Sequence, residues 1–389
     1  MTGTLLLILI AALGCVWAVS LGLTLYGTLY ALEQLDNPPP HLDAPFGLYP
    51  VTILKPLKGA DAGIEENLES FFRLDYPDYE MIFSIADSRD PVRAVVLRLM
   101  ERYPEVDARL IEGAVDAGPN PKVNNMLQSY SLARHDLVLI SDSNIRVKRD
   151  YLKRLIAHMD NSTGVITAVV AGVGAKRWGG RLEAMYLNTF YARFMRLASL
   201  CGHPCVVGKS MLFRKSVASR FGGIATLARY LAEDYMTGIA MQRLGLKAVI
   251  MSDPVEQYIG RYSFSDFWAR HLRWGRIRKA QAPVAFLFEP LSGSIVCAIL
   301  GAIAGSCTFQ EFPLAVFLLA HFTIWAACDL ALNRRMSGSG ATRSLATWCA
   351  REALAFPLWF HSLCGNTVLW RGRKLRVAPG GLLHTNSIN

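Results

Sequence analysis

Hydrophobic residues form long uninterrupted runs at both ends of the chain and short, spaced runs in its middle. No charged residue occurs between Met1 and Leu32. About 20 apolar residues suffice to cross a bilayer. The run from Leu5 to Leu32 therefore predicts a permanent N-terminal membrane anchor within residues 1–33. A cleavable signal peptide has a shorter apolar core and a basic start, and this segment has neither.

Apolar runs return after Pro290 and predict a membrane region over residues 284–389 that ends in a basic tail. Two spans are expected, at about 291–308 and 312–332. A further apolar stretch, 345–370, contains Arg351 and Glu352, which are costly in a helix that faces lipid. This stretch needs a separate explanation.

Basic residues flank these runs and indicate their orientation, because cytoplasmic loops are enriched in Lys and Arg. One cluster precedes the second span, one follows the third span and one follows the last stretch: residues 270–279, then Arg334, Arg335 and Arg343, then Arg371, Arg373, Lys374 and Arg376. If all three are cytoplasmic, stretch 345–370 leaves and returns on one side. It is too short to cross twice, so we expect a re-entrant or interfacial segment. A third full span that breaks the charge rule is the alternative.

The middle of the chain, residues 34–262, alternates short apolar runs with helical patterns and predicts one domain on the cytoplasmic side. Expected strands are 51–54, 81–85, 108–111, 137–140 and 164–170, and expected helices are 65–72, 92–103, 124–133 and 152–159. Such alternation indicates an α/β fold with a mostly parallel sheet covered on both faces. Ligands bind such sheets beyond the carboxyl ends of the strands.

The formal net charge of +10 suits an anionic partner. The basic residues lie beside apolar segments, which favours a bilayer surface over nucleic acid. Cys201, His203 and Cys205 are close enough in sequence to suggest a metal site, but no second ligand pair accompanies them. We therefore interpret them as structural residues.

Two acidic residues follow predicted strands. Asp87 comes after the strand at 81–85, and Asp142 follows the strand at 137–140. Both are expected to reach the same crevice. Asp142 and Asn144 offer a carboxylate and an amide oxygen two residues apart, which are the donors that Mg²⁺ and Mn²⁺ prefer. Helix caps and turns use the same residue types.

Two later segments carry further candidates. Glu233 and Asp234 begin a predicted helix, where a carboxylate can cap the helix or act as a general base. Arg270, Arg273 and Trp274 lie in a predicted amphipathic interfacial helix at 263–283. Its arginines can bind a diphosphate and its Trp can sit at a membrane interface, although an ordinary basic face explains the same pattern.

Together, these residues resemble a known set of motifs. Asp87, Asp142, Asp234 and the R-x-x-R-W sequence at 270–274 are similar to the signature of inverting, membrane-bound GT-A glycosyltransferases. Shorter strings resemble the ceramide glucosyltransferase family (family 21, related to family 2): 106–110, 120–125, 142–147, 232–235, 289–292 and 365–370. The chain departs from the commonest pattern in having Asn144 where an Asp often stands, and Arg270 where polysaccharide synthases have Gln.

The resemblance assigns roles to individual positions. It implies that Asp87 holds uridine and that Lys55 and Lys122 lie near the nucleotide. It implies a divalent metal on Asp142, and Asp234 as the general base. Arg273 and Trp274 would engage the diphosphate and the acceptor at the membrane.

The resemblance also implies a function: transfer of a sugar from a UDP-sugar, first of all UDP-glucose, to the hydroxyl of ceramide, with inversion to a β-glycoside. Galactose or glucuronate as the sugar, and a hopanoid or diacylglycerol as the acceptor, remain open. A processive polysaccharide synthase is the alternative, but a polymer channel requires more membrane helices than three or four. The catalytic domain would face the cytoplasm, at the inner membrane of a bacterium or the Golgi of a eukaryote.

Overall fold

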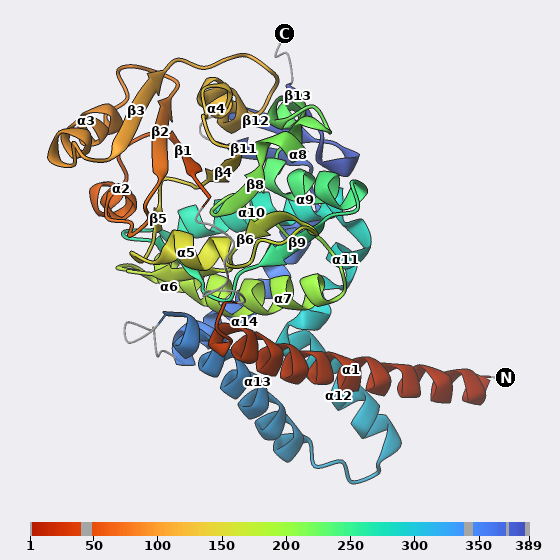
Figure 1. Ribbon diagram of the computed structural model, residues 1–389. Coiled ribbons are helices and arrows are strands. Elements are labelled where there is room, and N and C mark those ends of the chain that lie inside the picture. The colour runs from red at the N-terminus through yellow and green to blue at the C-terminus, as the bar shows by residue number, and fades with distance from the viewer. Residues whose placement is uncertain (1, 40–48, 338–344, 371–372, 386–389) are drawn as a thin grey trace.

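The computed structural model of the protein describes residues 2–39, 49–337, 345–370 and 373–385. A mixed α/β body carries most of the chain, and three long helices extend beneath it (Figure 1). These helices are α1 (Thr2–Asp36), α12 (Ser294–Thr308) and α13 (Leu314–Ser337). Arg343 and Arg371, which belong to the predicted basic clusters, lie outside the described residues.

The centre of the body is a seven-stranded sheet in the order β3-β2-β1-β4-β8-β6-β9. Its strands are β1 (Val51–Leu57), β2 (Tyr79–Ile85), β3 (Asp107–Glu112), β4 (Leu137–Ile140), β6 (Thr163–Thr167), β8 (Met211–Arg214) and β9 (Lys247–Ile250). Strands β3, β2, β1 and β4 are parallel, as are β6 and β9, whereas β8 is antiparallel to both of its neighbours. The predicted α/β class with a mostly parallel sheet is confirmed.

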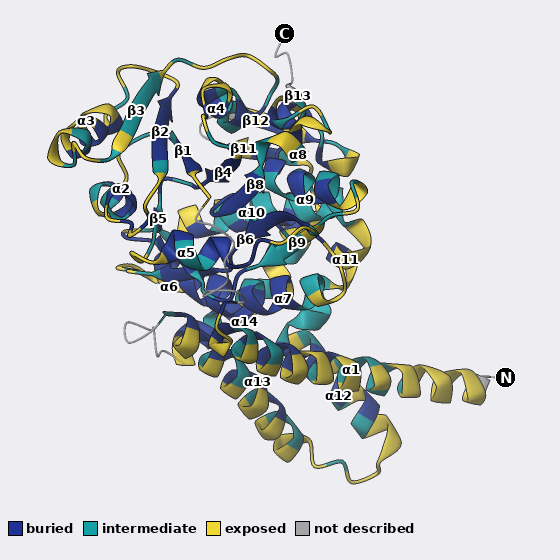
Figure 2. Ribbon diagram, viewed as in Figure 1, coloured by how far each residue is buried: buried dark blue, intermediate teal, exposed yellow. Residues whose placement is uncertain are grey.

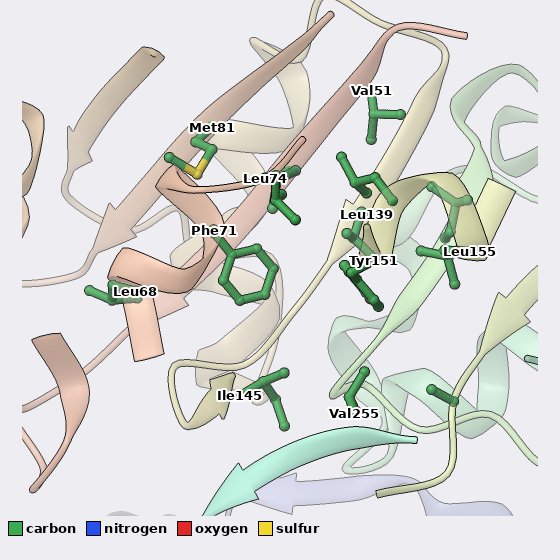
Figure 3. Packing of buried hydrophobic residues seen from close by; sticks show 14 of the residues in the cluster. Val51, Leu68, Phe71, Leu74, Met81, Leu139, Ile145, Tyr151, Leu155 and Val255 are labelled. Atoms are coloured by element: carbon green, nitrogen blue, oxygen red, sulfur yellow. The ribbon is translucent and has the colours of Figure 1, made fainter. Parts of the chain in front are cut away.

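The apolar runs become central strands because both faces of this sheet are covered. Strand β4 is buried along its whole length. On one face, helix α2 (Ile64–Phe72) brings Leu68 and Phe71 toward Met81 and Leu139 (Figure 3). Further helices of the body are α3 (Val92–Arg102), α4 (Pro121–Ser131), α5 (Tyr151–Ile156), α6 (Trp178–Tyr186), α7 (Ala192–Leu200), α8 (Lys215–Ser219) and α9 (Glu233–Arg243).

Two smaller sheets flank the central one. The expected strand at 164–170 is divided, because β7 (Val170–Val173) leaves the central sheet and pairs with β10 (Val255–Tyr258), which also pairs with β5 (Ile145–Arg146). Near the C-terminus, β11 (Thr367–Trp370), β12 (Arg373–Val377) and β13 (Leu383–Thr385) form an antiparallel sheet. Strands β11 and β12 lie next to α10 (Phe264–Gln281).

Two helices are long and apolar enough to cross a membrane, Gly3–Asp36 and Leu314–Ser337, among the residues that the structure describes. A third span is possible if Pro283–Ser292 and Ser294–Thr308, which meet at a 72° bend, are counted as one. Much of α1 and α13 is exposed (Figure 2), and the exposed residues include large apolar ones such as Leu7 and Leu29 of α1 and Leu319 of α13. Exposing so large an apolar surface to water is unfavourable, so this surface is suited to contact with the apolar interior of a bilayer.

The last apolar stretch, 345–370, is not one continuous helix. Helix α14 (Leu345–Leu363) ends seven residues before the end of the stretch, and β11 follows. Helix α14 packs against α10 and α6 of the body. Its buried Arg351 forms an ion pair with Asp329 of α13, which also binds Arg193 of α7. The polar residues that are costly in lipid are therefore paired inside the protein. Re-entrance and a full span both remain predictions.

Candidate active site

A cavity of about 1090 Å³ opens at the carboxyl ends of β1, β2 and β4. Its walls come from α4, α7, α9, α10, from the π-helix η1 (Leu187–Tyr191) and from α11 (Pro283–Phe288). Predicted site residues that line it are Asp87, Lys122, Asp142, Asn144, Asp234, Arg270, Arg273 and Trp274. The fold thus brings together side chains that lie as far apart in sequence as Asp87 and Trp274.

Asp142 lies at the centre of the ionic part of the cavity. The main chain turns there directly after β4 and Ser141. Its Oδ1 lies 2.9 Å from Lys122 Nζ and its Oδ2 lies 3.1 Å from Lys209 Nζ. Burial alone would raise the pKa of Asp142, but the two ammonium groups outweigh it and hold that pKa well below its usual range. Asp142 is therefore ionised at any physiological pH.

Asn144 extends this cluster. Its Oδ1 accepts a hydrogen bond of 2.9 Å from Lys209 Nζ, so one ammonium group bridges Asp142 and Asn144. Among the described residues, no group of three or more His, Cys, Asp or Glu side chains could hold a metal. The side-chain oxygens of Asp142 and Asn144 are both donors of the kind that Mg²⁺ and Mn²⁺ prefer. They do not form a complete metal cage.

Glu233 and Asp234 begin α9 on the opposite wall. Asn120 caps α4 and also donates from Nδ2 to Glu233 Oε2 over 3.2 Å. Lys122 Nζ lies 2.8 Å from Glu233 Oε1. Because Lys122 pairs with both Asp142 and Glu233, its ammonium group links the two sides of the cavity.

Asp234 is held at the cavity surface by the backbone. Its Oδ2 accepts a 2.7 Å hydrogen bond from the N–H of Gly208. A Cβ at position 208 would lie 2.7 Å from Lys122 Nζ, so a larger residue there would displace the Lys122 ammonium group. Burial and the neighbouring charge of Glu233 raise the pKa of Asp234 to about 6. A carboxylate with this pKa is an effective proton acceptor near neutral pH.

Two predicted donor-binding residues differ in their surroundings. Asp87 lies at the exposed rim and pairs with Arg89 at 3.2 Å. Lys55 is fully buried and is absent from the described lining of the cavity. Its Nζ donates to Ser141 Oγ and to the carbonyl oxygen of Asp142, and it lies 3.5 Å from the centre of the Phe71 ring. Lys55 thus supports the turn that presents Asp142 from beneath.

The R-x-x-R-W segment forms the wall contributed by α10. Ser263 caps this helix in a capping box with Asp266, which fixes where it begins. The guanidinium of Arg270 lies 4.3 Å from the Trp274 ring, and its Nε lies 3.2 Å from Glu183 Oε1 of α6. Arg270 is therefore held between an aromatic face and a buried carboxylate, facing the ionic part of the cavity.

At the other end of the cavity, the apolar end, the lining contributed by η1, α7 and α11 is mostly apolar, although the Arg278–Glu289 ion pair also faces the cavity there. Phe190, Phe194 and Ala198 line it from η1 and α7, and Ala285 and Phe286 line it from α11. Helix α7 packs against the candidate membrane helix α1. Helix α11 belongs to the segment Pro283–Ser292, which meets α12 at the 72° bend. One continuous space thus joins a cluster of charged groups to a mostly apolar region beside the candidate membrane helices.

Lys209 and Glu183 were absent from the sequence prediction. Lys209 is a single lysine directly after an apolar stretch, and Glu183 is the one acidic residue of α6. Neither has a clear signal in the sequence, because Lys209 lies between Gly208 and Ser210, and Arg181 lies two residues before Glu183. Cys201 and Cys205 are free thiols, while His203 contacts the hydroxyl of Tyr235 at 3.0 Å.

Comparisons with known proteins give a family match and several similar relatives. Residues 12–383 match the family described as Glycosyl transferase family 21. Ceramide glucosyltransferase 3 of Caenorhabditis elegans is 32% identical over 342 residues, which cover 85% of this chain and 73% of that relative. Ceramide glucosyltransferase of Komagataella phaffii is 28% identical over 462 residues, covering 95% of this chain and 90% of that relative.

Among solved structures, a mannosyltransferase from Pyrobaculum calidifontis in complex with GDP-Man and Mn²⁺ is similar, with a TM-score of 0.55. The likeness covers 92% of this chain and 99% of that chain at 20% sequence identity. At this identity the likeness establishes the fold alone. The predicted GT-A fold is confirmed.

Proposed function

The chain belongs to glycosyltransferase family 21 and is a hexosyltransferase; from this premise we propose that it transfers glucose from UDP-glucose to a hydroxyl group of ceramide. The observation that carries this proposal is the single cavity with an ionic end and an apolar end. A nucleoside diphosphate sugar is anionic, and a lipid acceptor is apolar apart from its head. Each substrate matches one end, and the two meet near Asp234.

The donor is assigned to the ionic end. We propose that Asp87, at the rim beyond β2, binds the uridine. Lys122, Arg270 and Arg273 surround the place proposed for the diphosphate and supply positive charge to it. Trp274 supports Arg270 through its ring face. Lys55 acts indirectly, because it holds the turn at Asp142 from beneath.

A divalent ion, Mg²⁺ or Mn²⁺, is proposed to join the donor at Asp142 and Asn144. The ion would supply charge neutralisation for the departing diphosphate. The low pKa of Asp142 keeps its carboxylate available as a ligand. The amide oxygen of Asn144 serves as a neutral second ligand, in a position where related enzymes often have a carboxylate.

Asp234 is the proposed general base. In a single displacement, the acceptor oxygen bonds to the anomeric carbon while the bond from that carbon to the diphosphate breaks. The hydroxyl proton passes to the carboxylate of Asp234. Attack from the face opposite the leaving group inverts the configuration, so an α-linked donor gives a β-glycoside. The hydrogen bond from Gly208 N–H orients Asp234 for this step.

The acceptor is assigned to the apolar end. Phe190, Phe194 and Phe286 offer apolar surface to the lipid chains, and each buried methylene group contributes about 0.8 kcal/mol. The place of this end beside α1 and the bend before α12 supports access from the bilayer. The lipid would then present its hydroxyl to Asp234 without leaving the membrane entirely.

This proposal includes a division of the chain. Residues 1–33 anchor the protein, 34–262 form the catalytic domain on the cytoplasmic side, 263–283 lie at the interface, and 284–389 form the C-terminal membrane region. The two candidate spans support an integral membrane protein. The inner membrane of a bacterium or the Golgi of a eukaryote fits this orientation.

A donor-by-acceptor matrix tests the function. Purified protein in detergent would be incubated with UDP-glucose, UDP-galactose, UDP-glucuronate or UDP-N-acetylglucosamine and with ceramide, diacylglycerol or a hopanoid. UDP release and lipid product would be measured together. We expect glucosylceramide from UDP-glucose as the main product. Preferential glycosylation of another lipid would refute ceramide as the acceptor, and a product of increasing length would indicate a polysaccharide synthase.

A further inference from the structure

Lys209 occupies the position that a metal ion would take between Asp142 and Asn144. Its Nζ lies 3.1 Å from Asp142 Oδ2 and 2.9 Å from Asn144 Oδ1. The side chain is 9% exposed and lies in the loop that leads into β8. Both oxygens assigned to the metal therefore already bind one ammonium group.

A divalent ion and this ammonium group exclude each other on geometric grounds. Mg²⁺ lies about 2.0–2.1 Å from its oxygen ligands. An ion bound to both Asp142 and Asn144 would occupy nearly the same space as Lys209 Nζ, and its charge would repel the ammonium group. Lys209 must move before the ion can bind both oxygens.

Lys122 differs from Lys209 in having a second carboxylate partner. It contacts Asp142 Oδ1 at 2.9 Å and Glu233 Oε1 at 2.8 Å. Its place is therefore fixed from two walls of the cavity. Lys209, by contrast, contacts one carboxylate and one neutral amide, and its flexible four-carbon side chain can swing. Lys209 is the ammonium group that can be displaced at lower cost.

We propose that Lys209 and the divalent ion are alternative occupants of the Asp142–Asn144 oxygen pair, and that the ion displaces the Lys209 ammonium group toward the donor diphosphate. This rests on the proposed function only in taking a nucleoside diphosphate as the donor. The identity of the sugar and of the acceptor does not enter.

The exchange couples the ion to the nucleotide. Without a nucleotide, the ion has to remove Lys209 from its partners and gives it no new one. With a diphosphate present, phosphate oxygens complete the coordination of the ion and also accept the displaced ammonium group. Each ligand therefore strengthens the binding of the other, and this coupling is reciprocal. Lys209 would also remain beside the diphosphate as a source of positive charge.

Titration of Mn²⁺, followed by electron paramagnetic resonance of the free ion, tests this exchange on the full-length protein in detergent. Three variants are compared with the original chain, each with and without UDP. Lys209→Met removes the ammonium group, Lys209→Arg keeps a cation, and Lys247→Met removes an exposed lysine from β9 at the far edge of the central sheet.

Without UDP, we expect Lys209→Met to bind Mn²⁺ about tenfold more tightly than the original chain, which corresponds to the loss of one charge-assisted contact. Lys209→Arg and Lys247→Met should both bind Mn²⁺ as weakly as the original chain does. UDP should strengthen Mn²⁺ binding more in the original chain than in Lys209→Met. Thermal unfolding of each variant identifies any that does not fold, and Lys209→Gln then replaces Lys209→Met.

Equal Mn²⁺ affinity in the original chain and in a folded Lys209→Met would overturn the proposal. Absence of Mn²⁺ binding in both, with UDP present, would overturn it as well. Neither readout uses sugar transfer. A failure here with glucosylceramide still formed leaves the proposed function intact, and the reverse result leaves the exchange intact.

Discussion

Glu183 Oε2 of α6 and His271 Nε2 of α10 lie 2.8 Å apart. The Glu183 carboxylate is fully buried at this contact. The other oxygen of Glu183 pairs with Arg270. Burial alone would raise the pKa of Glu183, but the cationic neighbours outweigh it and lower that pKa. Glu183 is therefore an ionised residue that positions the proposed diphosphate-binding arginine.

Replacing Glu183 with Gln should weaken donor binding. Arg270 would keep its buried charge but lose its anionic partner, and it would turn away from the Trp274 ring. We expect the KM for the donor to rise by about tenfold with a smaller change in kcat, since this contact acts in the ground state. The free energy of unfolding should also fall by about 3 kcal/mol. An unchanged donor KM in a folded variant would contradict the positioning role.

Replacing Asp234 with Asn should abolish turnover and preserve donor binding. The amide cannot accept the hydroxyl proton, and general-base catalysis contributes about 10²–10⁴-fold. Glu233→Gln is the matched control, because Glu233 adjoins Asp234 in the chain and was the next candidate for the base. Single-turnover sugar transfer and UDP binding would be measured for both variants. A larger loss in Glu233→Gln than in Asp234→Asn would move the base to Glu233.

The pH dependence of the reaction should follow Asp234. Burial and the Glu233 charge raise its pKa to about 6, so the carboxyl is protonated below that pH and cannot act as a base. We expect kcat/KM to be flat above pH 7 and to fall about tenfold per pH unit well below pH 6. Initial rates at several pH values, with the protein checked for folding at each, give this profile. An acidic limb centred near pH 4 would argue against a buried base.

A bulky residue at the apolar end should discriminate between acceptors by chain length. Ala198→Trp would fill space near Phe194, and losing contact with about two methylene groups costs roughly tenfold in kcat/KM. We expect that loss for a long-chain ceramide and a smaller one for a short-chain analogue. Leu319→Trp, on the exposed face of α13, is the control and should leave both rates unchanged. Equal losses for both acceptors would place the lipid chains elsewhere.

The loop between α12 and α13 tests the proposed orientation. If the two helices form a membrane hairpin, Gln310 lies on the side opposite the catalytic domain. A reporter inserted at Gln310 should give an extracytoplasmic signal, and one inserted in the exposed turn at Gly245 should give a cytoplasmic signal. The same signal at both sites would refute the hairpin.

The local sequence was enough to predict those helices and strands that depend on a local apolar pattern. Uninterrupted apolar runs indicated the anchor and the two later spans, and short apolar runs indicated the central strands. The start of α4 shows the limit of this method. The apolar pattern suggested 124–133, but the helix begins at Pro121 because Asn120 accepts hydrogen bonds from the N–H groups of Lys122 and Val123. Capping, rather than hydrophobicity, sets that boundary.

The sequence also indicated which acidic residues would meet, since carboxyl ends of parallel strands share one edge of a sheet. Asp87 and Asp142 do line one cavity, and Asp234 joins them. Their chemical roles remain proposals. The burial of Lys55 beneath the turn was not predictable from sequence, because its partners, Ser141 and Asp142, follow a different strand, β4.

Only the tertiary structure decided how charge is distributed within the cavity. Lys209 and Asp142 are 67 positions apart, and no periodicity relates them. The pairing of Glu183 with Arg270 likewise depends on how α6 packs against α10. Hydrophobic patterns record whether a side chain faces water, and this fixes elements and spans. Ion pairs depend on which elements pack together, so they become visible only when the whole chain is folded.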